Sequence, residues 1–256
     1  METLNGTERG VMKVIATIEA RMGSTRLPGK VLREVVGVPL LGHLISRLQA
    51  CDKLDDFVVA TTTSPADDVI DEYCQSLGVA VFRGDEDDVL GRVLAAASSL
   101  AADVVVETTG DNPLLDPEIV DLHVDTFLSN TADYVSNVVV PTFPNGMDVQ
   151  VFSLETLRTS EASANHPLDR EHVTRHIRQH PEIFTQINVI APLAVRRPDL
   201  SVTVDVDADF EIVRLVLENL YNPSEPFTCT DLVVFLDGHT EIAELNSKVR
   251  RKGMNS

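Results

Sequence analysis

Short apolar runs alternate with helical segments through the first half of the chain, and this alternation limits the choice of fold more than any other feature. The runs are residues 14–18, 57–60, 79–82 and 104–107, and the helical segments are residues 38–51, 65–77, 89–100 and 117–128. A strand followed by a helix, four times in succession, indicates a mostly parallel sheet covered by helices on both faces. The sequence therefore predicts an α/β fold.

The pattern changes after Thr131. Residues 134–140 and 147–152 are predicted strands separated by the turn-rich segment 141–146, residues 154–162 and 170–180 are predicted helices, and residues 184–190 are again extended. We interpret this region as a small mixed α+β insertion over one end of the sheet. A strand at 202–206 and helices at 207–220 and 230–236 follow. We place a single domain at residues 13–240, after a flexible leader (1–12) and before a C-terminal tail (241–256).

A cationic loop follows the first predicted strand, with the sequence E-A-R-M-G-S-T-R-L-P-G-K-V-L. It carries the charges of Arg21, Arg26 and Lys30, and Gly23 and Gly29 give its backbone freedom. The carboxyl end of a strand in an open α/β sheet is where phosphates bind, because cations and exposed amides meet there. We favour a triphosphate site over the alternative of a surface loop with solvated cations.

Two common phosphate loops do not fit this segment. Five residues separate Gly23 from the Gly29-Lys30 pair, where the Walker A pattern has four, and Val31 stands where that pattern has Ser or Thr. No G-x-G-x-x-G pattern follows any predicted strand, so a dinucleotide fold of that type has no support.

The composition of the chain limits the kinds of molecule that it is expected to bind. The chain has 256 residues and a net charge of -19, which argues against binding a nucleic-acid backbone and means that an anionic substrate needs local cations and a divalent metal. Three widely spaced cysteines form neither a disulfide framework nor a zinc pattern. No apolar run approaches the roughly 20 residues of a membrane span, and the first ten residues lack the apolar core of a secretory signal. We expect a cytoplasmic protein without a membrane partner.

Two aspartates are candidate metal ligands. Asp111 follows Gly110 at the end of the fourth predicted strand, and Asp205 ends the strand predicted at 202–206. Mg²⁺ binds through one or two carboxylates together with substrate phosphates, so a metal between these side chains and the cationic loop is the favoured interpretation. The alternatives are helix caps or turn residues, and Asp207 is the predicted cap of the next helix.

Three histidines, His172, His176 and His180, repeat every four residues and are predicted to share one helical face. We consider a polar stripe more plausible than a metal site, since the order is not H-E-x-x-H. Arg170, Glu171, His172 and Arg175 could instead face a substrate. Serine catalysis has no support, because no G-x-S-x-G pattern occurs.

Seven motifs, in register from about residue 14 to about residue 220, carry a family resemblance. They are A-R-M-G-S-T-R-L-P-G-K-V-L, V-V-A-T-T-T-S-P-A-D-D, V-F-R-G-D-E-D-D-V-L-G-R, T-T-G-D-N-P-L-L-D-P, A-D-Y-V-S-N, N-G-M-D-V-Q-V-F-S and R-E-H-V-T. Together they resemble the SpsF family of spore-coat polysaccharide biosynthesis, which is similar to the cytidylyltransferases that make CMP-activated octulosonic and sialic acids.

The resemblance implies a Rossmann-like nucleotide-diphospho-sugar transferase fold, usually homodimeric, with residues of about 131–200 serving the acceptor and the dimer. It implies transfer of CMP from CTP to a sugar acid or related acceptor, with release of pyrophosphate and with Mg²⁺ as cofactor, in surface-glycan biosynthesis. Lys30, Arg21 and Arg26 match the catalytic triphosphate-binding residues, and Asp111 and Asp205 match the metal ligands. The implied nucleotide contacts are Ala20, Met22, Gly23, Ser24, Thr61, Thr62, Thr63, Arg83 and Gly110. The implied acceptor contacts are Asn112, Asp148, Arg170, Glu171 and His172.

Three departures from the family pattern lie near these positions. Glu19 stands where Gln is common, Asn112 stands where Cys is common, and V-D-V-D-A-D replaces L-D-T-P-E-D. Base choice or metal geometry could therefore differ. Two other functions stay open at this point: a cytidylyltransferase for a small phosphate or phosphonate, and a nucleotide-binding protein without catalytic activity.

Overall fold

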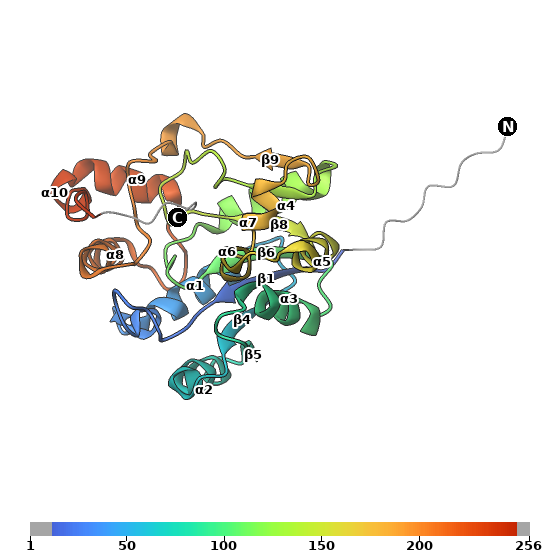
Figure 1. Ribbon diagram of the computed structural model, residues 1–256. Coiled ribbons are helices and arrows are strands. Elements are labelled where there is room, and N and C mark those ends of the chain that lie inside the picture. The colour runs from blue at the N-terminus through green and yellow to red at the C-terminus, as the bar shows by residue number, and fades with distance from the viewer. Residues whose placement is uncertain (1–11, 250–256) are drawn as a thin grey trace.

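A seven-stranded sheet forms the centre of the protein in a computed structural model, which describes residues 12–249 (Figure 1). Its strand order is β5-β4-β1-β6-β8-β7-β9. The strands are β1 (Val14–Glu19), β4 (Asp56–Thr62), β5 (Ala80–Gly84), β6 (Val104–Thr109), β7 (Tyr134–Ser136), β8 (Gln150–Ser153) and β9 (Gln186–Asn188). A separate two-stranded antiparallel ribbon joins β2 (Glu34–Val35) and β3 (Val38–Pro39).

β8 is antiparallel to both of its neighbours, whereas every other pairing within this sheet is parallel. β1 lies between β4 and β6, so Glu19 is paired with Ala60 on one side and Thr109 on the other. Strands buried on both faces read as continuous apolar runs, which is why the first half of the sequence shows them so clearly. The predicted mostly parallel α/β sheet is confirmed.

Helices cover both faces of this sheet (Figure 1). The helices are α1 (Leu40–Gln49), α2 (Asp68–Ser76), α3 (Val89–Ser99), α4 (Pro117–Ser129), α5 (Leu154–Ser163), α6 (Pro167–Glu171), α7 (Arg175–Gln179), α8 (Asp207–Leu220), α9 (Cys229–Gly238) and α10 (Thr240–Ala243), with 3-10 turns at Lys30–Leu32, Pro65–Asp67 and Leu193–Val195. Along β1, Ile15 packs in the cluster that contains α3 and α5, and Ala16 and Ile18 pack in the cluster that contains α1, α4, α8 and α9. The two clusters are the two apolar layers of the fold.

The strand predicted at 202–206 is wrong. This segment has no strand, and the nearest pairing is an isolated bridge between Asn145 and Ser201, just before it. Its backbone is satisfied elsewhere, since Val202 N–H donates to Asn145 O at 2.8 Å and Val204 N–H donates to Asp111 O at 2.9 Å. The apolar alternation of the segment reflects burial of Val202 and Val204 against the core, which a loop can also provide.

The single helix predicted at 170–180 is also wrong. α6 ends at Glu171 and α7 begins at Arg175, because His172 adopts an extended backbone with φ of -116° and ψ of 99°. The three histidines therefore do not share one helical face. His176 and His180 remain neighbours, with ring centroids 4.3 Å apart, whereas His172 faces a cavity.

The predicted helix cap at Asp207 is wrong as well. The fully buried Asp209 carboxylate accepts hydrogen bonds from the backbone N–H groups of Asp205 and Val206, each at 3.0 Å. Asp207 is largely exposed and pairs with Arg33 at 2.7 Å. A carboxylate three residues inside a helix can satisfy the free N–H groups before it, so the cap came from the later aspartate.

Several predicted boundaries shift. β7 is shorter than the strand predicted at 134–140, β8 begins later than the strand predicted at 147–152, and the helix predicted at 65–77 starts as a 3-10 turn. Most of the predicted leader and the end of the predicted tail lie outside the described residues. Among residues 12–249, no helix has the length and apolar character needed to cross a membrane.

Candidate active site

The cationic loop leaves the carboxyl end of β1 and is anchored by a buried aspartate. The Asp67 carboxylate accepts a 2.7 Å hydrogen bond from Met22 N–H and further bonds from the backbone and hydroxyl of Thr62. Met22 O in turn accepts a 3.0 Å bond from Gly29 N–H, and Gly29 has a φ of 69° that favours glycine. The loop is thus folded back on itself. Asp67 lies in the segment 65–77 that the sequence predicts to be helical, and nothing in that pattern indicates this anchoring role.

Lys30 connects this loop to the two predicted metal ligands. Its ammonium nitrogen lies 2.8 Å from Asp111 Oδ2 and 3.2 Å from Asp205 Oδ1, and it also donates to Val204 O at 2.6 Å. Arg26 lies 3.0 Å from the same Asp205 oxygen. Lys30 is 9% exposed, so it sits in a low-dielectric setting in which opposite charges interact strongly. The structure brings together residues from three distant parts of the sequence.

Asp111 and Asp205 form a pair of carboxylates that fits Mg²⁺. Thr109 Oγ1 donates to Asp111 Oδ1 at 2.6 Å, and Lys30 already places one positive charge between the two side chains. Across residues 12–249, no group of three or more His, Cys, Asp or Glu side chains is arranged to hold a metal. A two-carboxylate site suits Mg²⁺, which takes its remaining ligands from phosphates and water.

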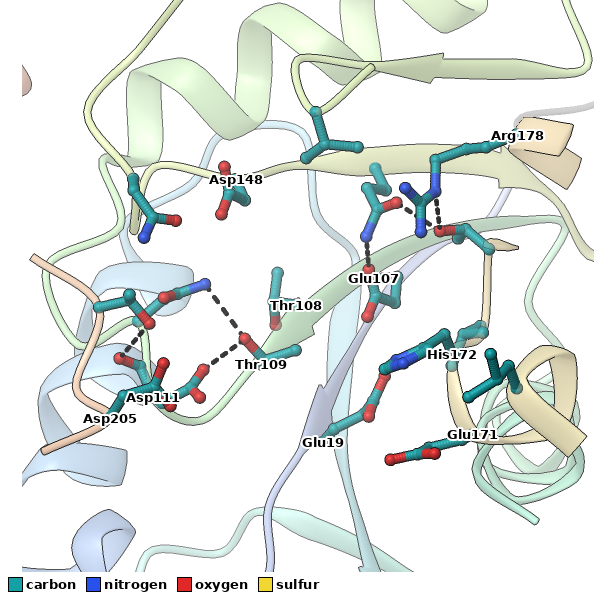
Figure 2. Close-up of a pocket in the computed structure, with 18 residues that line it drawn as sticks. Glu19, Glu107, Thr108, Thr109, Asp111, Asp148, Glu171, His172, Arg178 and Asp205 are labelled. Atoms are coloured by element: carbon teal, nitrogen blue, oxygen red, sulfur yellow. Dashed lines mark hydrogen bonds between the residues drawn. The ribbon is translucent and has the colours of Figure 1, made fainter. Parts of the chain in front are cut away.

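Two adjoining cavities open at this edge of the sheet. The larger has a volume of about 470 Å³ and includes Asp111, Asn112, Asp148, Asp205 and residues of α6 and α7 (Figure 2). The smaller has a volume of about 360 Å³ and is formed by the cationic loop with Val89 and Arg92. Both cavities are lined by Glu19, Thr109, Asp111, Glu171 and His172.

Most of the residues predicted for the triphosphate line the smaller cavity. They are Arg21, Gly23, Ser24, Arg26 and Lys30. Arg21 is half exposed and lies 3.3 Å from Glu86. Gly110 lines neither cavity, but a Cβ there would meet Glu19 O at 3.0 Å, so the close approach of β6 and β1 requires glycine.

The residues that the resemblance assigns to cytosine recognition are Ala20, Met22 and Thr61 to Thr63, and of these Ala20 alone lines one of the two cavities. Thr61 and Thr62 are buried, and the Thr62 hydroxyl donates to Asp67. Arg83 pairs with Asp68 at 2.7 Å and donates to the backbone carbonyl groups of Thr62 and Ser64 at 2.8 Å each. Met22 also lines neither cavity. Thr63 is exposed.

Four of the five predicted acceptor residues line the larger cavity: Asn112, Asp148, Glu171 and His172. Arg170 does not. Its guanidinium group pairs with Asp88 and with Glu161, the latter at 2.8 Å, and these contacts hold α6 against α3 and α5.

Sequence reasoning missed a buried network on the far wall of the larger cavity. Glu107, 5% exposed, accepts a hydrogen bond from Gln150 Nε2, and Gln150 Oε1 accepts bonds from Tyr134 and from Thr174. Arg178 Nε donates to Thr174 Oγ1 at 3.3 Å. The sequence shows Glu107 only as the last residue of an apolar strand run, and nothing in it pairs Glu107 with Gln150.

Burial makes this wall electrostatically unusual. It raises the pKa of Glu107, and burial together with the adjacent Glu107 carboxyl group raises the pKa of Glu19 well above its ordinary value. Burial also raises the pKa of Asp148 to about 6, with Asp111 and Glu107 acting in the same direction. Ionisable groups with shifted pKa values in a cleft are typical of functional sites.

Comparison with known proteins agrees with the fold and with the motifs. A cytidylyltransferase family profile matches residues 15–225. An uncharacterized protein of Methanocaldococcus jannaschii is 38% identical over 243 residues, which cover 94% of this chain and 97% of that protein. The spore coat polysaccharide biosynthesis protein SpsF of Bacillus subtilis is 31% identical over 235 residues, covering 90% of this chain and 96% of SpsF. The solved structure of a cytidylyltransferase from Leptospira borgpetersenii has a TM-score of 0.86 at 32% identity, covering 91% and 97% of the two chains.

These matches define the class of the protein as a nucleotidyltransferase with a Rossmann-like fold. The chain belongs to the cytidylyltransferase family, and the predicted resemblance to SpsF is confirmed.

Proposed function

We propose that this enzyme transfers CMP from CTP to a sugar acid or related acceptor, with release of pyrophosphate, in the biosynthesis of a surface glycan. Membership of the cytidylyltransferase family supports the nucleotide, and the name of its relative SpsF supports the polysaccharide context. The site residues and the acceptor are part of this proposal.

One observation carries the proposal: Lys30 of the cationic loop lies within 3.2 Å of both Asp111 and Asp205 at the mouth of two joined cavities. A basic loop for the triphosphate and a carboxylate pair for its counterion are what nucleotidyl transfer needs in one place. The neighbouring larger cavity supplies room for an acceptor.

The reaction requires mainly positioning and charge stabilisation. An acceptor oxygen attacks the α-phosphorus of CTP, and the bond from that phosphorus to the bridging oxygen of the β-phosphate breaks. Arg21, Arg26 and Lys30 bind the triphosphate and stabilise the negative charge that develops on the departing pyrophosphate. Backbone groups of Gly23 and Ser24 complete this contact.

Asp111 and Asp205 would hold Mg²⁺. Bound there, the ion would neutralise phosphate charge and help to align the reacting oxygen with the α-phosphorus. Thr109, which donates to Asp111 at 2.6 Å, fixes the orientation of one of these carboxylates.

The acceptor is assigned to the larger cavity, with Asn112, Asp148, Glu171 and His172 as its contacts. Arg170 contributes indirectly in this proposal, because its pairs with Asp88 and Glu161 position α6 and hence Glu171. Cytosine recognition around Ala20, Met22 and residues 61–63, and the nucleotide contacts assigned to Arg83 and Gly110, stay predictions.

We also propose a homodimer in the cytoplasm. β9 is an end strand of the sheet, and its Asn188 Oδ1 accepts a 2.8 Å hydrogen bond from Val140 N–H. Val140 is 52% exposed and Leu193 is 83% exposed. Burying such side chains against a second copy would remove apolar surface from water.

Pyrophosphate release tests the function directly. The purified chain is supplied with Mg²⁺, each of the four NTPs and a panel of sugar acids, sugars and small phosphonates. We expect release with CTP and one class of acceptor, and mass spectrometry of the product then identifies that acceptor. Saturable CTP binding without release would support a non-catalytic role, and absence of both would overturn the proposal.

A further inference from the structure

The far wall of the larger cavity has its hydrogen-bond donors engaged with the protein. Gln150 Nε2 donates to Glu107, and the Thr174 hydroxyl donates to Gln150 Oε1 at 2.6 Å. The Tyr134 hydroxyl donates to the same Gln150 oxygen. These three donors are therefore occupied within the protein, and the Glu107 carboxyl group, which also shares a hydrogen bond with Glu19, is the acidic group of this wall.

On the opposite wall, side-chain donors are likewise bonded to other protein groups. Thr109 donates to Asp111, and Asn112 Nδ2 donates to Thr109 Oγ1 at 3.1 Å. Asn145 Nδ2 donates to Ser201 Oγ at 2.9 Å. The Asn112 side chain is nine-tenths buried, and its Oδ1 has no hydrogen-bond partner. A buried acceptor without a partner is costly, so this oxygen points to a donor that a ligand would supply.

The charged side chains that line the larger cavity are mostly acidic. Besides Asp111 and Asp205, which face Lys30, the lining includes the carboxyl groups of Glu19, Glu107, Asp148 and Glu171. Figure 2 shows Glu19, Glu107 and Asp148 around one opening. The basic residues of this lining are Arg178 and His172, and Arg178 lies close enough to Glu107 to oppose the pKa increase of that carboxyl group.

Asp148 lies between other acidic groups of this lining. Its carboxyl group accepts a hydrogen bond from the backbone of Gly146, and the charged groups that act on it are the carboxylates of Asp111 and Glu107. Burial penalises the ionised forms of Asp148 and Glu107, so a positive charge entering the cavity would stabilise both. A ligand that carried only negative charge at this position would be repelled.

An ammonium group has three donors, a single positive charge and no acceptor, and it needs no fixed coordination geometry. It matches carboxylates on one side and the free Asn112 oxygen on the other.

We propose that the acceptor carries an ammonium group, which the larger cavity binds through Glu107, Asp148 and Asn112. The inference rests on the proposed function and narrows its acceptor to a hydroxyl-bearing compound with a primary amine, such as an amino sugar. A carboxylate elsewhere on the same acceptor is compatible with the proposal.

The test measures binding with probes that differ in one substituent. Glucosamine, N-acetylglucosamine and glucuronate are titrated separately against the full chain in an amine-free buffer, and dissociation constants are taken from saturation-transfer NMR. We expect glucosamine to bind at least tenfold more tightly than either of the others. Equal binding of the acetylated sugar, or tighter binding of glucuronate, overturns the proposal.

Substitutions in the larger cavity then test whether Glu107 and Asp148 cause the preference for glucosamine. Glu107→Gln and Asp148→Asn keep the size of each side chain and should each reduce the tenfold preference below threefold. Asp125→Asn is the matched control, because it removes one carboxylate from an exposed pair with Lys53 and should leave the preference unchanged. A preference that survives both cavity variants overturns the assignment, and circular dichroism confirms that each variant is folded.

Pyrophosphate release is measured in parallel with the same three sugars and CTP. A glucosamine preference in binding, without CTP binding or pyrophosphate release from any acceptor, would remove the proposed function and leave the ammonium site standing. CTP turnover with acetylated or purely acidic acceptors, without a glucosamine preference, would do the opposite.

Discussion

The backbone carbonyl oxygen of Asp111 accepts a 2.9 Å hydrogen bond from the backbone N–H of Val204. This bond joins the loop after β6 to a segment that is not part of the sheet, and it sets Asp205 beside Asp111. Lys30 then bridges the two carboxylates. The carboxylate pair is therefore held by backbone contacts between two loops, and its function can be tested from each side.

Lys30→Met should lower kcat/KM for CTP-dependent pyrophosphate release by about 100-fold or more, because removing one group that stabilises transition-state charge has effects of this order. Lys53→Met provides the control, since Lys53 forms an exposed pair with Asp125 and should retain activity. Unchanged activity of Lys30→Met would contradict the role of the loop.

Gly146→Ala tests the contact between the loop before β8 and the segment that contains Asp205. Gly146 has a φ of 105°, and an added Cβ would lie 2.8 Å from Thr203 N, next to the bridge between Asn145 and Ser201. We expect a loss of about 1–3 kcal/mol in the free energy of unfolding, measured in urea, together with reduced pyrophosphate release.

Two other glycines serve as controls that separate the cost of a positive φ from the cost of a steric clash with Thr203. Gly37→Ala also places alanine at positive φ but meets no atom within 4 Å, so it should cost less than Gly146→Ala. Gly238→Ala, at the end of α9 with open space around it, should not destabilise the protein. Equal losses at positions 37 and 146 would show that contact with Thr203 is unimportant.

Asp67→Asn should destabilise the protein by about 1–3 kcal/mol and weaken CTP binding, because a buried acceptor for Met22 and Thr62 is replaced by a mixed donor and acceptor. Asp68→Asn changes the neighbouring, exposed aspartate and should shift stability by less than about 0.5 kcal/mol. Thermal unfolding and calorimetric titration with CTP measure the two effects. An Asp67 variant with normal CTP affinity would argue against anchoring of the loop.

Asp148 gives stability a defined pH dependence. Its pKa rises from the ordinary 3.8 to about 6 in the folded chain, so the folded state binds more protons than the unfolded state between these values. The contribution of this group to stability is therefore fully present below pH 3.8 and is lost as the pH rises toward 6. Asp148→Asn should gain stability relative to the unmodified protein over this range, which Tm measured against pH would show. A constant difference in Tm would contradict the shift.

The proposed homodimer can be tested by substitution of an exposed apolar side chain. Leu193→Glu puts a charge on a side chain that is 83% exposed, so it should convert a dimer to a monomer with little change in the stability of each subunit. Val234→Glu, on an exposed apolar residue of α9, is the control. Light scattering coupled to size exclusion gives the masses, and a Leu193 variant that stays dimeric would place the interface elsewhere.

The sequence predicted the parallel half of the fold well because strands such as β1 and β6 are buried on both faces and read as apolar runs. The sequence-based prediction was wrong where contacts between distant residues, rather than the local apolar pattern, determine the backbone conformation. Val202 and Val204 are buried like strand residues but bond to Asn145 and Asp111, and the helical periodicity of residues 170–180 is interrupted by the extended backbone of His172.

Some residues of the candidate site could likewise be predicted from the sequence and others could not. Lys30 and Asp111 could be grouped from the sequence because residues after the strand ends of a parallel sheet meet at one edge. Asp205 joins them although it follows no strand, because Val204 N–H bonds to Asp111 O. Glu107 and Gln150 could not, since each reads as an ordinary strand residue until the pairing of β6 with β8 places them side by side.

β8 runs against its neighbours, so it begins at the edge where β1 and β6 end. Gln150 therefore reaches that edge from the segment before β8, whereas the cationic loop reaches it from β1. The two segments meet through shared neighbours, because Gln150 bonds to Glu107 and Asn145 bonds to Val202, three residues before the Asp205 that contacts Arg26 and Lys30. A substitution in residues 141–150 can therefore be transmitted to residues 19–30.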